Sequence, residues 1–142
     1  MKKILFIFLI ALSTTCFAQD ISLFNSEGDA VAYIDTEDDD LTIYLWDGRP
    51  VCYLYSSNGD YHVYGFNGNH LGWFVEGIIR DHEGNAVGVT EEATTMFTNF
   101  EPFKSFKSFK PFKSFREFAP FQPFFSSSYS ATNFKLFLLK GI

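Results

Sequence analysis

The chain has 142 residues, carries a formal net charge of −6 and is rich in aromatic side chains, which make up 20% of it. This length supports one modest hydrophobic core. The composition excludes a protein with several membrane-spanning helices, because no run of about 18 apolar residues follows the first segment. The presence of only two cysteines excludes a disulfide-rich module.

Residues 1–18 predict a secretory signal peptide. The lysines Lys2 and Lys3 form a positive n-region, and the apolar run 4–12 has the length of an h-region. Cleavage before Gln19 exports the remaining chain to the periplasm, the outer envelope or the extracellular space. Lipidation of Cys16 is the less favoured alternative, because the three residues before it are not the small apolar residues that a lipoprotein peptidase prefers.

Residues 19–90 predict a β domain built from four copies of one pattern. Each copy has a ring residue, a polar residue, a glycine, two variable residues, an aliphatic residue, a small residue and a large apolar residue. The four glycines are Gly28, Gly48, Gly68 and Gly84. Asp47-Gly48 and Asn67-Gly68 suit two-residue type I′ turns, which need positive φ at both central positions. Each copy is therefore predicted to be a strand, a tight turn and a second strand.

The small position of the repeat predicts close packing in the interior. It is occupied by Ala32, Cys52, Gly72 and Gly88. A position that admits only small side chains indicates close backbone approach, near a shared axis or at a strand crossing. Cys52 then fits a small buried hydrophobe better than a nucleophile. Because a single hairpin cannot bury its own apolar face, we expect the four copies to pack together.

The repeats resemble the four-fold β-flower proteins of bacteria. The resemblance is carried by segments 43–51 and 63–74, and by 78–82 with the glycine and valine that follow. It covers residues 20–90 and implies an all-β fold, in which four short β-hairpins surround a pseudo-fourfold axis as a shallow, barrel-like flower. It transfers no catalytic residue.

Residues 91–142 form a Phe/Lys/Pro-rich, low-complexity tail that we expect to be largely irregular. From Phe97 to Phe124 every third residue is phenylalanine, and four prolines exclude a continuous α-helix. A polyproline II helix would place all ten rings on one edge, about 9 Å apart. Three hypotheses stay open: an extended or disordered tail, a tail docked on the β domain, and a tail that binds a membrane surface or a protein. The apolar end, residues 134–140, predicts one more strand or a short amphipathic anchor.

Charge divides the chain into two unlike parts. Residues 19–96 hold 15 acidic residues against 2 arginines, a net charge of −13, whereas residues 97–142 hold 7 basic against 2 acidic residues, a net charge of +5. The basic arm is expected to fold back on the acidic domain or to seek an anionic surface. The candidate residues for membrane or partner contact are Phe103, Phe106, Phe109, Phe112, Phe115, Lys104, Lys107, Lys110 and Lys113.

No motif in the sequence predicts catalysis. The three histidines and the single cysteine of the exported chain lack metal-site spacing, and no phosphate loop, dinucleotide fingerprint or elbow serine occurs. We therefore expect a non-catalytic envelope or secreted protein that needs no cofactor or metal and binds no nucleic acid. The alternative is a soluble module for an apolar molecule or a glycan, and a hydrolase is a minor one. The candidate ligand rim comprises Trp46, Arg49, Phe66, Asn69 and Trp73.

Overall fold

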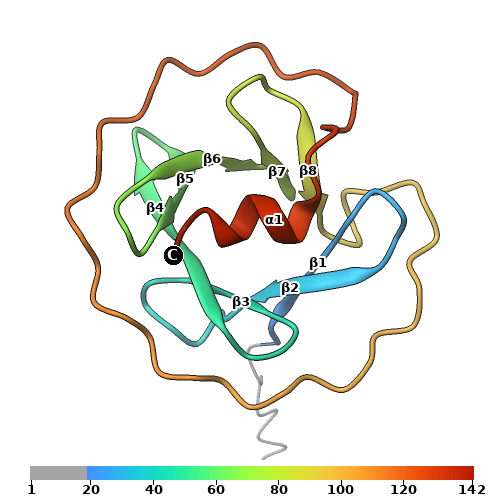
Figure 1. Ribbon diagram of the computed structural model, residues 1–142. Helices are drawn as coiled ribbons and strands as arrows, with labels where there is room; N and C mark the ends of the chain where they lie inside the picture. Colours follow the sequence, from blue (N-terminus) through green and yellow to red (C-terminus); the bar gives the residue numbers. More distant parts are fainter. Residues whose placement is uncertain (1–18) are drawn as a thin grey trace, which may run out of the picture.

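The computed structural model describes residues 19–142, so the predicted signal peptide lies outside the described part of the chain. The described chain folds into a closed antiparallel barrel of eight strands in sequence order (Figure 1). Its strands are β1 (Ile21–Phe24), β2 (Ala30–Ile34), β3 (Thr42–Leu45), β4 (Pro50–Ser57), β5 (Asp60–Gly65), β6 (His70–Val75), β7 (Ile78–Arg80) and β8 (Ala86–Val89). The predicted all-β fold of four hairpins is confirmed.

The four repeat glycines form the turns within the hairpins, but the predicted type I′ geometry is wrong. Gly48 has φ +91°, whereas Asp47 before it is not among the residues with positive φ. The turn spans Leu45 to Gly48, closed by the Gly48 N–H on the Leu45 carbonyl, and a register shift follows in the β3–β4 pair. This is a type I turn with a left-handed glycine and a bulge. The side chain of Asp47 accepts the N–H of Arg49 at 3.1 Å, which stabilises the turn.

These turns and the turns between hairpins lie at opposite ends of the barrel, because successive strands run in opposite directions. The Asn67 N–H donates to the Gly141 carbonyl at 3.1 Å, which places the C-terminal segment at the end that carries the four glycine turns. We call this the helix end. The opposite end carries the turns at 35–41, 58–59 and 76–77, and we call it the far end.

A short C-terminal helix, α1 (Phe134–Leu139), fills the barrel at the helix end (Figure 1). Its side chains Phe134, Phe137 and Leu138 are buried with the barrel core, and the side chain of Asn133 caps its first turn by accepting the N–H of Leu136. Of the two alternatives predicted for residues 134–140, the further strand is wrong. The apolar residues face the barrel axis, where an amphipathic helix buries them better than an edge strand would.

The small position of the repeat is explained by α1 and by strand packing. A Cβ on Gly88 would overlap the ring of Phe134, and one on Gly72 would overlap the carbonyl of Arg80 on the neighbouring strand. Cys52 is fully buried, and its Sγ lies 3.4 Å from the Leu138 carbonyl. Burial raises the pKa of the Cys52 thiol. The interpretation of Cys52 as a buried hydrophobe agrees with this environment.

Candidate interaction surface

Residues 97–124 circle the outside of the barrel, and we call this segment the belt (Figure 1). It forms neither helix nor strand, yet its backbone is fixed at regular intervals. Four backbone N–H groups, three in the belt and one just after it, donate to the carbonyls of the four repeat glycines at 2.8–3.1 Å. The bonds run from Asn99 to Gly28, from Ser108 to Gly48, from Glu117 to Gly68 and from Ser126 to Gly84. Nine residues of tail therefore correspond to one hairpin.

The glycines are needed for this contact as well as for their turns. A Cβ on Gly48 would overlap the carbonyl oxygen of Phe106, and the other three glycines meet the carbonyls of Phe97, Phe115 and Phe124 in the same way. The sequence contains this period, because Pro102, Pro111 and Pro120 also recur every nine residues. The three-residue period of phenylalanine is the stronger pattern in the same segment, and the nine-residue period was not used in the sequence-based prediction.

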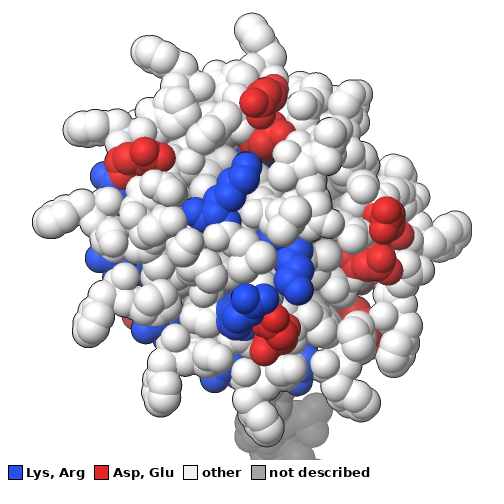
Figure 2. All heavy atoms as spheres, in the orientation of Figure 1, with Lys and Arg blue, Asp and Glu red and all other residues white. Residues whose placement is uncertain are grey.

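All ten phenylalanines of the belt point away from the barrel. Their side chains are 92–103% exposed, and the five predicted for membrane or partner contact are all at 100–102%. Figure 2 shows uncharged side chains projecting outward round the rim of the molecule, where Figure 1 places the belt. Ten exposed rings on one segment make the belt the candidate interaction surface of the molecule.

The belt lysines point inward, unlike the phenylalanines that separate them. Lys107 contacts Asp35 at 2.7 Å, and Lys110 contacts Asp38 at 2.7 Å. The remaining pairs are Lys104 with Asp20, Lys113 with Asp40, and Lys110 with Asp40. The hydrogen bond from Lys113 holds the pKa of Asp40 below its ordinary value. The basic arm thus folds back on the acidic domain, and the lysines do not share the outward face with the rings.

Cations of the belt also cover the tyrosines on the outer face of the barrel. Lys104 Nζ lies 4.3 Å from the ring centre of Tyr33, and the Arg116 guanidinium lies 3.8 Å from that of Tyr55. Such cation–π contacts add to the ion pairs. The belt is therefore held by backbone hydrogen bonds, ion pairs and cation–π contacts, while its phenylalanines stay free.

The predicted ligand rim does not assemble as a group of exposed aromatics. Phe66 and Trp73 are only 3% and 1% exposed. The indole N–H of Trp46 donates to the Pro102 carbonyl at 2.9 Å, and Arg49 pairs with Asp47 in its own turn. Asn69 lines a cavity of about 680 Å³ beside α1, whereas Trp46 lines a different one of about 360 Å³.

Three histidines that are separate in the sequence form a hydrogen-bonded row on the outer barrel face. His62 Nδ1 lies 2.9 Å from His70 Nε2, and His70 Nδ1 lies 3.0 Å from His82 Nε2. Burial, with smaller effects of His82 and His62, lowers the pKa of His70 to about 4. Glu117 of the belt accepts the backbone N–H of His70 at 2.6 Å. Sequence reasoning treated these histidines singly and missed the row, since only the strand register brings them together.

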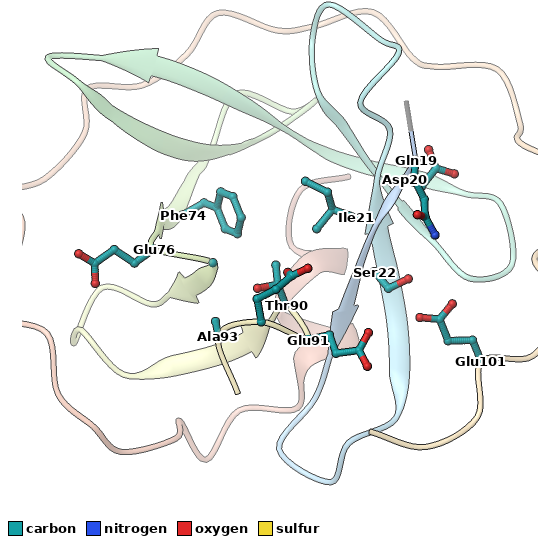
Figure 3. A pocket seen from close by; sticks show the side chains of 12 residues that line it. Gln19, Asp20, Ile21, Ser22, Phe74, Glu76, Thr90, Glu91, Ala93 and Glu101 are labelled. Atoms are coloured by element: carbon teal, nitrogen blue, oxygen red, sulfur yellow. The ribbon is translucent and has the colours of Figure 1, made fainter. Parts of the chain in front are cut away.

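A third cavity, of about 630 Å³, opens beside β1 near the far end (Figure 3). Phe74 and Ile21 face each other in its middle, and acidic side chains surround them. Its acidic lining residues are Asp20, Glu76, Glu91, Glu92 and Glu101. Within residues 19–142, no group of three His, Cys, Asp or Glu side chains is arranged to hold a metal ion. The acidic residues therefore contribute charge to this end of the barrel rather than a recognisable metal site.

The helix end carries both basic and acidic side chains. Lys135 and Lys140 of the α1 region are exposed, and Figure 2 shows basic side chains over the centre of this face with acidic ones around them. Glu27, Asp29, Asp47 and Glu83 belong to the glycine turns at this end. Leu136 and Ile142 are 60% and 55% exposed beside them. In the described part of the chain, no helix has the length and apolar character to cross a membrane.

The comparison with known families decides the classification. The family described as 4-fold beta flower protein matches residues 21–138. The chain belongs to this family. The match runs beyond the residues 20–90 that carry the resemblance in the sequence, so it includes the belt and nearly all of α1 of this β-flower protein. No curated protein and no solved structure matches the chain.

Proposed function

We propose that this β-flower protein is a non-catalytic, exported protein that binds membrane surfaces through its phenylalanine belt. The observation that carries the proposal is the near-complete exposure of all ten belt phenylalanines. Moving one such ring from water into an apolar medium contributes about 1.5–3 kcal/mol. Since micromolar binding corresponds to about 8 kcal/mol, insertion of a few rings suffices.

The uniformity of the belt favours lipid over a protein pocket. The rings are identical and evenly spaced along the chain, and the belt that carries them circles the barrel. A shaped pocket on a partner would bind one or two rings and leave the rest in water. A fluid lipid interface accepts every ring without matching its position, and aromatic side chains favour the boundary between headgroups and acyl chains.

The ion pairs of the belt lysines indicate that apolar contact, rather than charge, drives adsorption of the belt to lipid. Lys104, Lys107, Lys110 and Lys113 are engaged with carboxylates of the barrel, so they serve to hold the belt. Adsorption through the belt should then be chiefly apolar and should persist on neutral lipid at high salt. Export is supported by the predicted signal peptide at residues 1–18, and the lack of catalytic motifs supports a binding role.

Vesicle flotation tests this proposal. The chain 19–142 should float with phosphatidylcholine vesicles at low and high salt. Replacement of Phe103, Phe106, Phe109, Phe112 and Phe115 by serine should weaken binding at least tenfold, because each ring lost removes more than about 1 kcal/mol of transfer free energy. Replacement of the same residues by leucine is the matched control and should retain binding. Flotation of the serine variant at the level of the natural chain would overturn the proposal.

A soluble binding module is the second candidate function. It is favoured by the cavity of about 680 Å³ beside α1, which places Asn69 near His70, His82 and Lys140. Amide, imidazole and ammonium groups suit a small polar molecule such as a glycan. If the natural chain fails to float and instead shows glycan binding that Asn69→Ala abolishes, this function replaces the first.

A further inference from the structure

The position of the belt restricts how a bilayer can meet the molecule. The belt runs round the barrel axis, and its side chains project sideways in the plane of the ring (Figures 1 and 2). A bilayer that met the side of the barrel would reach only the few rings on that side. A bilayer that met one end of the barrel would reach all ten at a similar depth.

The belt lies at the helix end. Its backbone is bonded to the four repeat glycines, which form the turns at this end, and the segment that follows it leads directly into α1. The lysine side chains extend from the belt toward the turn at Asp35–Asp40, at the far end. The rings are therefore closer to the face formed by α1 than to the opposite face.

The α1 face carries the groups that an anionic lipid surface attracts. Lys135 and Lys140 are exposed, and among residues 19–142 neither forms an ion pair. Leu136 and Ile142 add apolar side chains that are 60% and 55% exposed. Basic and apolar groups on one face, surrounded by aromatic rings, are the features of a helix that lies on an anionic membrane.

The far end carries a dense group of acidic side chains. Asp20, Glu76, Glu91, Glu92 and Glu101 surround the cavity beside β1 (Figure 3). The turn between β2 and β3 adds Asp38, Asp39 and Asp40, of which Asp39 makes no ion pair within residues 19–142. The negative potential of an anionic leaflet repels this end. The turns at the helix end also carry Glu27, Asp29, Asp47 and Glu83, so the ends differ chiefly in the two lysines of the α1 region, which make no ion pair within residues 19–142. These lysines favour the same end as the position of the belt.

We propose that the α1 face is the lipid-facing surface, and that Lys135 and Lys140 give the protein a preference for anionic phospholipid headgroups. The inference rests on the proposed membrane binding by the belt and specifies its orientation and lipid class. The belt supplies attachment to any bilayer, whereas the two lysines supply the selectivity. A basic residue near an anionic surface strengthens binding about fivefold, so the pair should contribute about 25-fold.

Binding to two vesicle compositions tests the lipid preference. The natural chain should bind mixed phosphatidylglycerol/phosphatidylcholine vesicles more tightly than phosphatidylcholine alone. Lys135→Gln with Lys140→Gln should remove most of that difference and leave phosphatidylcholine binding unchanged. Lys135→Arg with Lys140→Arg should retain it, as the control that keeps the charge. Equal binding of the glutamine variant and the natural chain to the mixed vesicles would overturn the inference.

A fluorescent label tests the orientation independently of net charge. Leu136→Cys lies on the α1 face and Glu91→Cys lies near the far end, and each accepts a polarity-sensitive probe because the natural Cys52 is fully buried. The label at 136 should shift to the blue on vesicles and the label at 91 should not. A blue shift at 91 alone would overturn the orientation while leaving belt binding intact. Failure of the natural chain to bind either vesicle would overturn the proposed function and this inference together.

Discussion

The backbone N–H of Ser108 donates to the carbonyl of Gly48 at 2.9 Å, so one residue of a low-complexity tail is bonded to the tip of one hairpin. Equivalent bonds join the tail to the other three hairpins. A tail with few apolar contacts of its own is thus ordered by a repeat of nine residues that matches the fourfold repeat of the barrel. The exposed rings are presented by a backbone that the barrel holds in place.

Replacement of Gly48 by alanine should release this part of the belt. Gly48 has φ +91°, and a Cβ there would overlap the carbonyl of Phe106. The substitution therefore adds backbone strain of about 1 kcal/mol and removes the nearby hydrogen bonds. Together these effects should lower the free energy of unfolding by about 2–3 kcal/mol. Urea unfolding measures the loss, and protease cleavage near Lys107 reports the release of the belt.

Gly59 provides the matched control for Gly48. It also has positive φ, +85°, but nothing lies within 4 Å of the position of its Cβ. Gly59→Ala should therefore cost only the backbone strain, about 1 kcal/mol, and leave the belt resistant to protease. If both variants lose the same stability and both belts resist cleavage, the contact between glycine and belt has no energetic role.

Acid should destabilise the protein through His70 between pH 6.5 and about 4. Burial lowers the pKa of His70 to about 4, below the 6.5 of an exposed histidine. Over this interval the unfolded chain binds a proton that the folded chain does not, so stability is fully present above pH 6.5 and is lost as the pH falls toward 4. The loss approaches about 3 kcal/mol at 1.36 kcal/mol per pH unit.

Urea unfolding between pH 7 and pH 4 measures this loss. His70→Phe removes the titrating group but keeps a buried ring. It should therefore reduce the change in the free energy of unfolding with pH. Asp40 titrates in a separate range, because Lys113 holds its pKa below the ordinary 3.8. The contribution of Asp40 to stability is present above about pH 3.8 and is lost as the pH falls below it. An unchanged slope in His70→Phe would contradict the role of the histidine row.

Prediction from the sequence succeeded where information is local and failed where it depends on long-range contacts. The repeat glycines and the small positions are encoded within each copy, so Gly28 and Gly88 could be assigned a turn and a close contact in advance. The type I′ turn was wrong because the Asp-Gly pair also fits a type I turn followed by a left-handed glycine.

The belt and the histidine row depend on the register of residues far apart in the chain. The three-residue period predicted that the ten rings share one edge, but the sites that hold the belt lie up to 84 residues away in the chain, as in the ion pair between Lys104 and Asp20. His62, His70 and His82 meet only through the pairing of β5, β6 and β7. The segment 134–140 was ambiguous because seven residues show too little periodicity to separate strand from helix.

Truncation of the Phe134 side chain, whose ring lies inside the barrel, should be among the most destabilising single changes. Phe134 is 2% exposed, and its ring occupies the space over Gly88, so Phe134→Ala should cost about 3–5 kcal/mol. Leu136→Ala is the control on the same helix, and at 60% exposure it should change stability by less than about 0.5 kcal/mol. If Phe134→Ala costs no more than Leu136→Ala, α1 does not form part of the core. The double variant Phe134→Ala with Gly88→Ala addresses the same contact, because the added methyl group refills part of the cavity and should restore some of the lost stability.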